Sequence, residues 1–155
     1  MNRLSSILAV LTLLVSTASC ATDLSARAVP DANLGKDLSY FVVKQPKDNG
    51  GINVSICEQL NDWGRSTTTG TAEGVPEELN VLVTYEDKWY WDINMYLLSL
   101  DISFRDPTTE EEIAGGYSMA TSFVRRNGGE HARLILPEVF AKTNPEETPP
   151  VKEGK

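Results

Sequence analysis

The histidine and the cysteines set the limits on catalysis in this chain of 155 residues. A Ser, Thr or Cys nucleophile needs a base beside it and a third group that orients the base. His131 is the one histidine, and no sequence signature joins it to Cys57 or to a Gly-x-Ser-x-Gly elbow. We therefore expect a surface histidine, a small apolar helix residue at Cys57, and no catalytic residues.

Acidic residues and paired glycines offer no cofactor chemistry either. Residues 110–112 (Glu-Glu-Glu) lack the spacing of a calcium loop, so we expect a solvated charged turn that opposes aggregation. The pairs Gly115-Gly116 and Gly128-Gly129 lack the flanking residues and the spacing of phosphate-binding loops. The sequence thus predicts no metal site and no cofactor.

Aromatic residues gather in residues 85–92 (YEDKWYWD), where one expected strand ends and the next begins. Trp and Tyr join a large apolar body to a polar tip, which suits them to binding surfaces. The candidate binding surface consists of Tyr85, Trp89, Tyr90 and Trp91. It can stack on sugar rings, receive a protein partner or dip into lipid headgroups. The alternative is that alternate rings extend the core across the end of the sheet.

Residues 1–19 have the pattern of an export signal. Arg3 supplies a positive charge, and residues 7–15 (ILAVLTLLV) form an apolar run that fits a signal core. That run is too short to span a bilayer, which needs about 20 residues. The small residues 16–19 (STAS) follow, as the shallow pockets of signal peptidases require.

The segment Thr17-Ala18-Ser19-Cys20 resembles a bacterial lipobox, although Leu is usual where Thr17 stands. The resemblance implies that Cys20 becomes the lipidated first residue of the mature protein. Because Ala21 follows Cys20, it also implies the periplasmic face of the outer membrane. The alternative is ordinary cleavage, for example after Ala18, to a soluble periplasmic protein. Cys20 would then keep its thiol and could form a disulfide with Cys57 in the oxidising periplasm.

The acidic balance of the chain limits its partners. Lys and Arg number 14 and Asp and Glu number 22, which gives a net charge of −8. Without a basic footprint, the chain is not expected to bind nucleic acid. Purely electrostatic adhesion to anionic lipid is also disfavoured. We therefore expect membrane contact through the lipid anchor and a protein partner in the envelope.

One folded domain is expected, because the length of the chain suits a single hydrophobic core. The predicted organisation is a signal peptide at 1–19, a lipidated cysteine with a flexible tether at 20–37, a single α/β domain at 38–142, and a disordered tail at 143–155. The tail is rich in proline and glutamate and has no aromatic residue. It therefore buries too little apolar surface to offset the entropy of ordering.

Hydrophobic periodicity places the elements of this domain. It predicts a strand at 38–44, a helix at 52–63 with a cap at 48 or 49 and a stop at Gly64, a polar loop at 65–78, strands at 79–87, 95–105 and 113–124, and a helix at 130–142 broken or kinked by Pro137. The order β-α-β-β-β-α predicts an α+β fold. Its one mostly antiparallel sheet should carry two helices on one face and water on the other.

This order is similar to small bacterial envelope lipoproteins of unknown function, whose fold resembles the α/β core of the curli-secretion lipoprotein. The likeness rests on the lipobox at Cys20, the strand-then-helix opening at 40–64, and the hairpin at 102–116. Within that hairpin, Glu110 and Ala114 replace a Gly and a Trp that these families tend to have. The resemblance implies an envelope component, such as an accessory subunit, and carries no catalytic residue.

These features together predict a lipid-anchored cell-envelope protein that acts as a binding or accessory subunit. A periplasmic small-ligand binder or hydrolase remains an alternative. It would need a closed pocket that holds a titratable group with a perturbed pKa. A purely structural lipoprotein is the third reading.

The intact mass of the mature protein from membranes tests the anchor. We expect a mass that corresponds to a chain beginning at acylated Cys20. A chain that begins at Ser19 and carries no lipid would refute the anchor.

Overall fold

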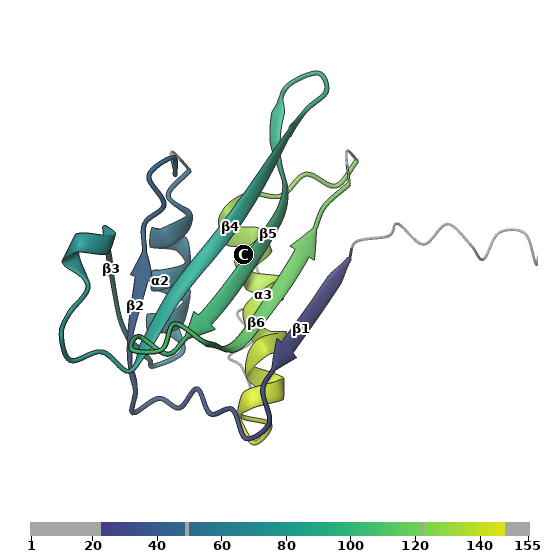
Figure 1. The fold of residues 1–155 in the computed structure, drawn as a ribbon. Helices are drawn as coiled ribbons and strands as arrows, with labels where there is room; N and C mark the ends of the chain where they lie inside the picture. The colour runs from purple at the N-terminus through teal and green to yellow at the C-terminus, as the bar shows by residue number, and fades with distance from the viewer. Residues whose placement is uncertain (1–22, 49, 122, 148–155) are drawn as a thin grey trace, which may run out of the picture.

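The computed structural model describes residues 23–147 except 49 and 122. The expected signal segment, Cys20 and residues 148–155 lie outside the described residues. Within the described part, six strands form one sheet, and two α-helices cover one of its faces (Figure 1). The predicted α+β fold, with one sheet and two helices on one face, is therefore confirmed.

The sheet is mixed, with three antiparallel pairings and two parallel ones. In chain order the elements are β1 (Leu24–Ala28), β2 (Ser39–Val43), α2 (Ile52–Asp62), β3 (Ser66–Gly70), the short 3₁₀ helix η1 (Ala72–Gly74), β4 (Val81–Trp91), β5 (Met95–Arg105), β6 (Glu112–Met119) and α3 (Gly128–Thr143). Across the sheet the strands lie in the order β1-β6-β5-β4-β2-β3. The predicted meander β4-β5-β6 is antiparallel, and β2 and β3 join it in parallel through β4.

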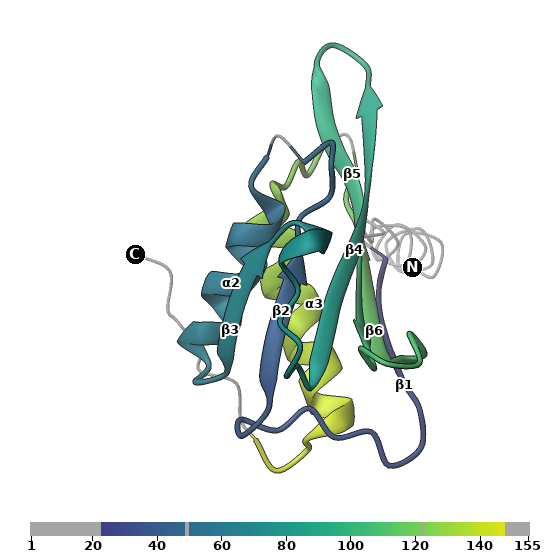
Figure 2. The same cartoon turned by 60° about the vertical axis from the view of Figure 1, so that its left-hand side comes forward.

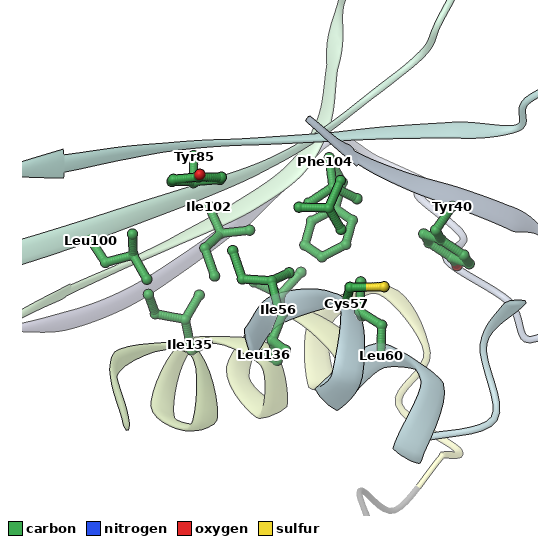
Figure 3. Close-up of a cluster of buried hydrophobic side chains, with 14 of the residues drawn as sticks. Tyr40, Ile56, Cys57, Leu60, Tyr85, Leu100, Ile102, Phe104, Ile135 and Leu136 are labelled. Atoms are coloured by element: carbon green, nitrogen blue, oxygen red, sulfur yellow. The ribbon is translucent and has the colours of Figure 1, made fainter. Parts of the chain in front are cut away.

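The hydrophobic core fills the space between the sheet and the helices. Alternate residues of the strands point toward the helices, as the period of two in the sequence predicts. Figure 3 shows this layer, with sheet residues above and helix residues below; the labelled members are Tyr40, Ile56, Cys57, Leu60, Tyr85, Leu100, Ile102, Phe104, Ile135 and Leu136.

Helix α2 is delimited by its flanking residues much as the sequence predicts. Gly51, just before it, has a φ of 66°, a left-handed conformation that glycine adopts without strain. The Asp48 carboxylate accepts a hydrogen bond of 3.2 Å from the backbone N–H of Asn53, so it caps the first turn. Gly64, with a φ of 78°, ends the helix and donates its N–H to the Asn61 carbonyl at 2.9 Å.

Helix α3 begins with a capping box and continues through a proline. The Asn127 side chain accepts from the N–H of Glu130, and the Glu130 carboxylate accepts from the N–H of Asn127. Pro137 lies inside the helix, which nevertheless runs from Gly128 to Thr143, so of the two predicted effects of Pro137, a break or a kink, the break does not occur. Burial of Leu136 and Phe140 on either side of it holds the helix against the sheet.

Adjacent glycines in β6 let both faces of the sheet be approached closely. A Cβ on Gly116 would lie 2.6 Å from Ile135 and 2.8 Å from Val139, which are side chains of α3. A Cβ on Gly115 would lie 2.6 Å from the guanidinium of Arg27, which crosses the opposite face. Gly115 and Gly116 therefore have a packing role, one on each side of β6.

Two strands lie where the sequence predicts none. β1 falls in the expected tether at 20–37, and β3 falls in the expected polar loop at 65–78. Each is an edge strand that pairs through its backbone with a single neighbour, β6 or β2. Because much of each strand stays exposed, neither shows the apolar alternation that identifies a half-buried strand.

Buried Arg65 joins both ends of the domain. Its guanidinium donates to the carbonyl of Leu34 at 3.2 and 3.0 Å and to the carboxylate of Glu147 at 2.9 Å. It also lies 3.7 Å from the centre of the Phe140 ring. The folded unit thus includes Leu34 and Glu147, which the sequence places in the tether and the tail.

Replacing Gly116 with Ala tests the close approach of α3. The new methyl group overlaps the α3 side chains, so we expect the free energy of unfolding to fall by about 1–3 kcal/mol. Urea denaturation measures the change. The matched control is Gly74→Ala, because a Cβ at Gly74 meets nothing within 4 Å. Equal stability of the two variants would show that α3 does not depend on the bare backbone.

Candidate functional site

Large apolar side chains are exposed at one end of the domain, which we call the apolar end. They are Trp89, Tyr90, Trp91, Ile93 and Met95 on the β4–β5 hairpin and Phe123 in the connection from β6 to α3. The exposed fraction reaches 66% at Trp91, 88% at Ile93 and 93% at Phe123. Exposed apolar clusters of this kind are candidate interaction surfaces.

The apolar end exists because the β4–β5 hairpin is longer than its neighbours. The two strands stay paired as far as Trp91 and Met95, but β6 reaches only Met119, opposite Ser99. On the other side, β2 pairs only with residues 81–83 of β4. The end of the hairpin therefore projects beyond the rest of the sheet and beyond the helices (Figures 1 and 2).

Polar contacts hold the apolar end in shape. Arg125 donates to Asp92 at 3.0 Å and also to Asn94, and its guanidinium lies 5.0 Å from the centre of the Tyr96 ring. These contacts attach the segment that carries Phe123 to the hairpin turn. The exposed apolar residues of the two connections are therefore held at the same end of the domain.

Three of the four residues in the sequence-predicted surface lie at the apolar end, and Tyr85 does not. Its side chain is 1% exposed and its hydroxyl donates to Asp48 at 2.6 Å. Burial and this hydrogen bond raise the pKa of Tyr85. Burial alone would raise the pKa of Asp48, but hydrogen bonds from Tyr85, Asn53 and Gly50 outweigh it and lower that pKa. Tyr85 is thus a core residue that fixes the loop before α2, which corrects the prediction.

The sequence reasoning missed Ile93, Met95 and Phe123. Ile93 carried a signal, because an isoleucine between Asp92 and Asn94 sits in a turn where polar residues are usual. Met95 and Phe123 carried none, since each fits an alternating strand pattern equally well. Their exposure follows only from where the neighbouring strands end.

The outer face of the sheet carries a polar hollow of about 180 Å³. Its lining residues are Arg27, Thr84, Tyr85, Glu86, Asp101, Ser103, Arg105 and Glu112. Arg27 donates to Glu112 at 2.6 Å and to Asp101 at 2.6 Å, and the Ser103 hydroxyl donates to Glu112 at 2.7 Å. The hydrogen bonds from Arg27 lower the pKa of Glu112, despite partial burial. Glu112 is therefore an ion-paired carboxylate at the start of β6, whereas Glu110 and Glu111 are exposed in the turn, as predicted.

The side chains of His131 and Cys57 lie in separate packing environments. His131 is fully buried on the inner face of α3, which corrects the expected surface position, and its Nδ1 lies 3.0 Å from the Ser118 hydroxyl. Burial lowers the pKa of His131 and raises the pKa of the Cys57 thiol. The thiol lies 3.4 Å from the carbonyl of Thr67 and belongs to the core side of α2, as predicted.

The part of the chain that the structure describes holds no cluster of three or more His, Cys, Asp or Glu side chains that could bind a metal ion. Among the same residues, no helix is long and apolar enough to cross a membrane. The exposed apolar end is therefore the feature of these residues that most calls for a function.

Comparisons with known proteins relate the chain to others by fold. No family model matches it, and no curated protein matches its sequence. Its fold is similar to that of PelC from Paraburkholderia phytofirmans, crystallised as a dodecamer, with a TM-score of 0.50, 10% identity, and coverage of 79% of this chain and 94% of PelC. A PelC variant dodecamer matches with a TM-score of 0.50, 8% identity, and coverage of 79% and 95%. At this identity the likeness shows the fold alone.

The pH dependence of stability tests the burial of His131. Because burial lowers the pKa of His131 below its ordinary value of about 6.5, the unfolded chain binds the proton more readily. The free energy of unfolding should therefore fall as the pH drops below about 6.5. Urea denaturation between about pH 7 and pH 5 measures this, since carboxylates titrate at lower pH. The variant His131→Gln should lose the slope, as the chain has no other histidine; an unchanged slope would contradict the assignment.

Proposed function

We propose that this protein is a lipid-anchored accessory protein of the bacterial cell envelope and that it works by binding through its apolar end. The observation that carries the proposal is the exposure of Trp89, Trp91 and Ile93 on a hairpin that leaves the sheet. Solvent-exposed tryptophans are costly to keep in water unless something covers them. A surface of this kind serves association rather than turnover.

The polar chemistry of the domain favours binding over hydrolysis. In the outer-face hollow, Arg27 binds both Asp101 and Glu112, so these three charged groups serve as structural ion pairs. His131 and Cys57 are buried among separate partners. The small-ligand and hydrolase alternative thus has less support than the accessory role.

The likeness to PelC supports membership of an assembly. PelC chains of this fold form dodecamers, so the fold suits a subunit that meets other chains. Within the described residues, β1 and β3 each pair on one side only, which leaves backbone groups at both edges of the sheet. We infer that this chain, anchored at Cys20 in the outer membrane, likewise joins other envelope proteins.

Attachment without the lipid tests the proposal. In a chain that carries Cys20→Ser and an ordinary cleavable signal, the apolar end should still hold part of the protein on the envelope. Adding Trp89→Ala and Trp91→Ala should lower the envelope-bound to soluble ratio by about tenfold, because tryptophan contacts dominate binding surfaces. Cell fractionation with immunoblotting measures the ratio.

The matched control is Val54→Ala, which removes an exposed apolar side chain from α2, outside the hairpin. It should leave the ratio unchanged, and circular dichroism should show that every variant is folded. A Cys20→Ser chain that is entirely soluble, with or without the tryptophans, would refute binding through the apolar end.

A further inference from the structure

We propose that the apolar end inserts into the headgroup region of the same lipid leaflet that holds the Cys20 anchor. The inference rests on the proposed function, because it takes Cys20 as the anchor point. It adds that lipid covers the apolar end. It also gives the orientation of the domain, with the β4–β5 hairpin toward the membrane.

The topology brings the first described residues and the apolar end to the same side of the molecule. β1 begins at Leu24, which pairs with Ser118 near the end of β6. One residue earlier, the Asp23 carbonyl accepts the N–H of Met119 at 2.8 Å. Met119 in turn lies opposite Ser99 of β5, just before the hairpin projects. The chain therefore enters the sheet at the end from which the hairpin leaves it (Figure 1).

The length of chain between the anchor and the sheet is short. Cys20 and Asp23 are three residues apart, and an extended chain covers at most about 3.6 Å per residue, so their Cα atoms lie within about 11 Å of each other. From Ser99, β5 continues four residues to Met95, which is about 13 Å at strand spacing. With the hairpin pointing at the membrane, its tip reaches at least as deep as the anchored cysteine.

The side chains at the tip suit the membrane interface. Trp89, Tyr90 and Trp91 have the amphipathic rings that gather at headgroup level, and Ile93 and Phe123 are apolar. The net charge of −8 supplies no general attraction to anionic lipid. Insertion therefore depends on apolar burial, and binding should change little with salt.

The same geometry favours lipid over a protein partner at this surface. A protein that covered Trp91 and Ile93 would have to fit between the domain and a leaflet that a three-residue segment holds close. The contacts of Arg125 with the hairpin turn keep Phe123 beside the hairpin, so the surface is formed before it meets lipid. Partner proteins then meet the sheet edges and faces that point away from the membrane.

Tryptophan quenching by brominated lipid tests the proposal. The acylated full-length protein is reconstituted in vesicles of phosphatidylethanolamine and phosphatidylglycerol, with and without a brominated phosphatidylcholine. Trp89 and Trp91 should lose emission in the brominated vesicles, and their emission should shift to shorter wavelength when vesicles are added. High salt should not reverse either change.

The chain provides its own internal control. Trp63 directly follows the C-terminal end of α2. Its ring packs on Phe140, with ring centres 5.2 Å apart. In the variant Trp89→Phe/Trp91→Phe, the remaining emission comes from Trp63 and should not be quenched. The variant Trp63→Phe should be quenched more completely than the parent.

The possible failures are distinguishable. Protein that floats with the vesicles but shows no quenching in the Trp63→Phe variant would overturn the inference and leave the anchor in place. Equal quenching of Trp63 would overturn the orientation. Protein that carries no lipid and does not float would remove the anchor, and both proposals would fall together.

Discussion

The close approach of α3 to β6 is the constraint on which the rest of the structure depends. Gly116 presents bare backbone to the helix layer, so Ile135 and Val139 lie directly against the strand. That contact sets the height of α3 above the sheet and hence the thickness of the core. Gly115 clears the opposite face, where Arg27 crosses β6 to reach its carboxylate partners. One dipeptide thus lets a helix and a guanidinium pack on the two sides of the same strand.

Polar links between distant segments complete the domain around this core. Buried Arg65 joins the segment before β2 to the segment after α3 through Leu34 and Glu147. The hydroxyl of Tyr85 binds Asp48 and fixes the loop that leads into α2. In each case a buried or half-buried charge has a hydrogen-bonding partner, which offsets the cost of removing it from water.

The β4–β5 hairpin differs from the rest of the domain because apolar side chains at its end stay exposed. Its pairing continues after its neighbours have ended, so Trp89, Tyr90 and Trp91 remain 45–66% exposed. On the outer face of the sheet, Arg27 is paired with two carboxylates within the domain. At the apolar end, by contrast, apolar side chains stay exposed to solvent. This difference supports the proposal that the hairpin binds and that the sheet serves as its support.

The sequence by itself determined the helices and the four strands with a buried face, because burial on one side imposes a periodicity that side chains record. It also determined the aromatic chemistry of residues 85–92. Only the tertiary structure decided the edge strands β1 and β3, which pair through backbone atoms common to every residue. It alone buried Tyr85 and exposed Trp89 and Trp91, since an alternating strand is covered only as far as its neighbours extend.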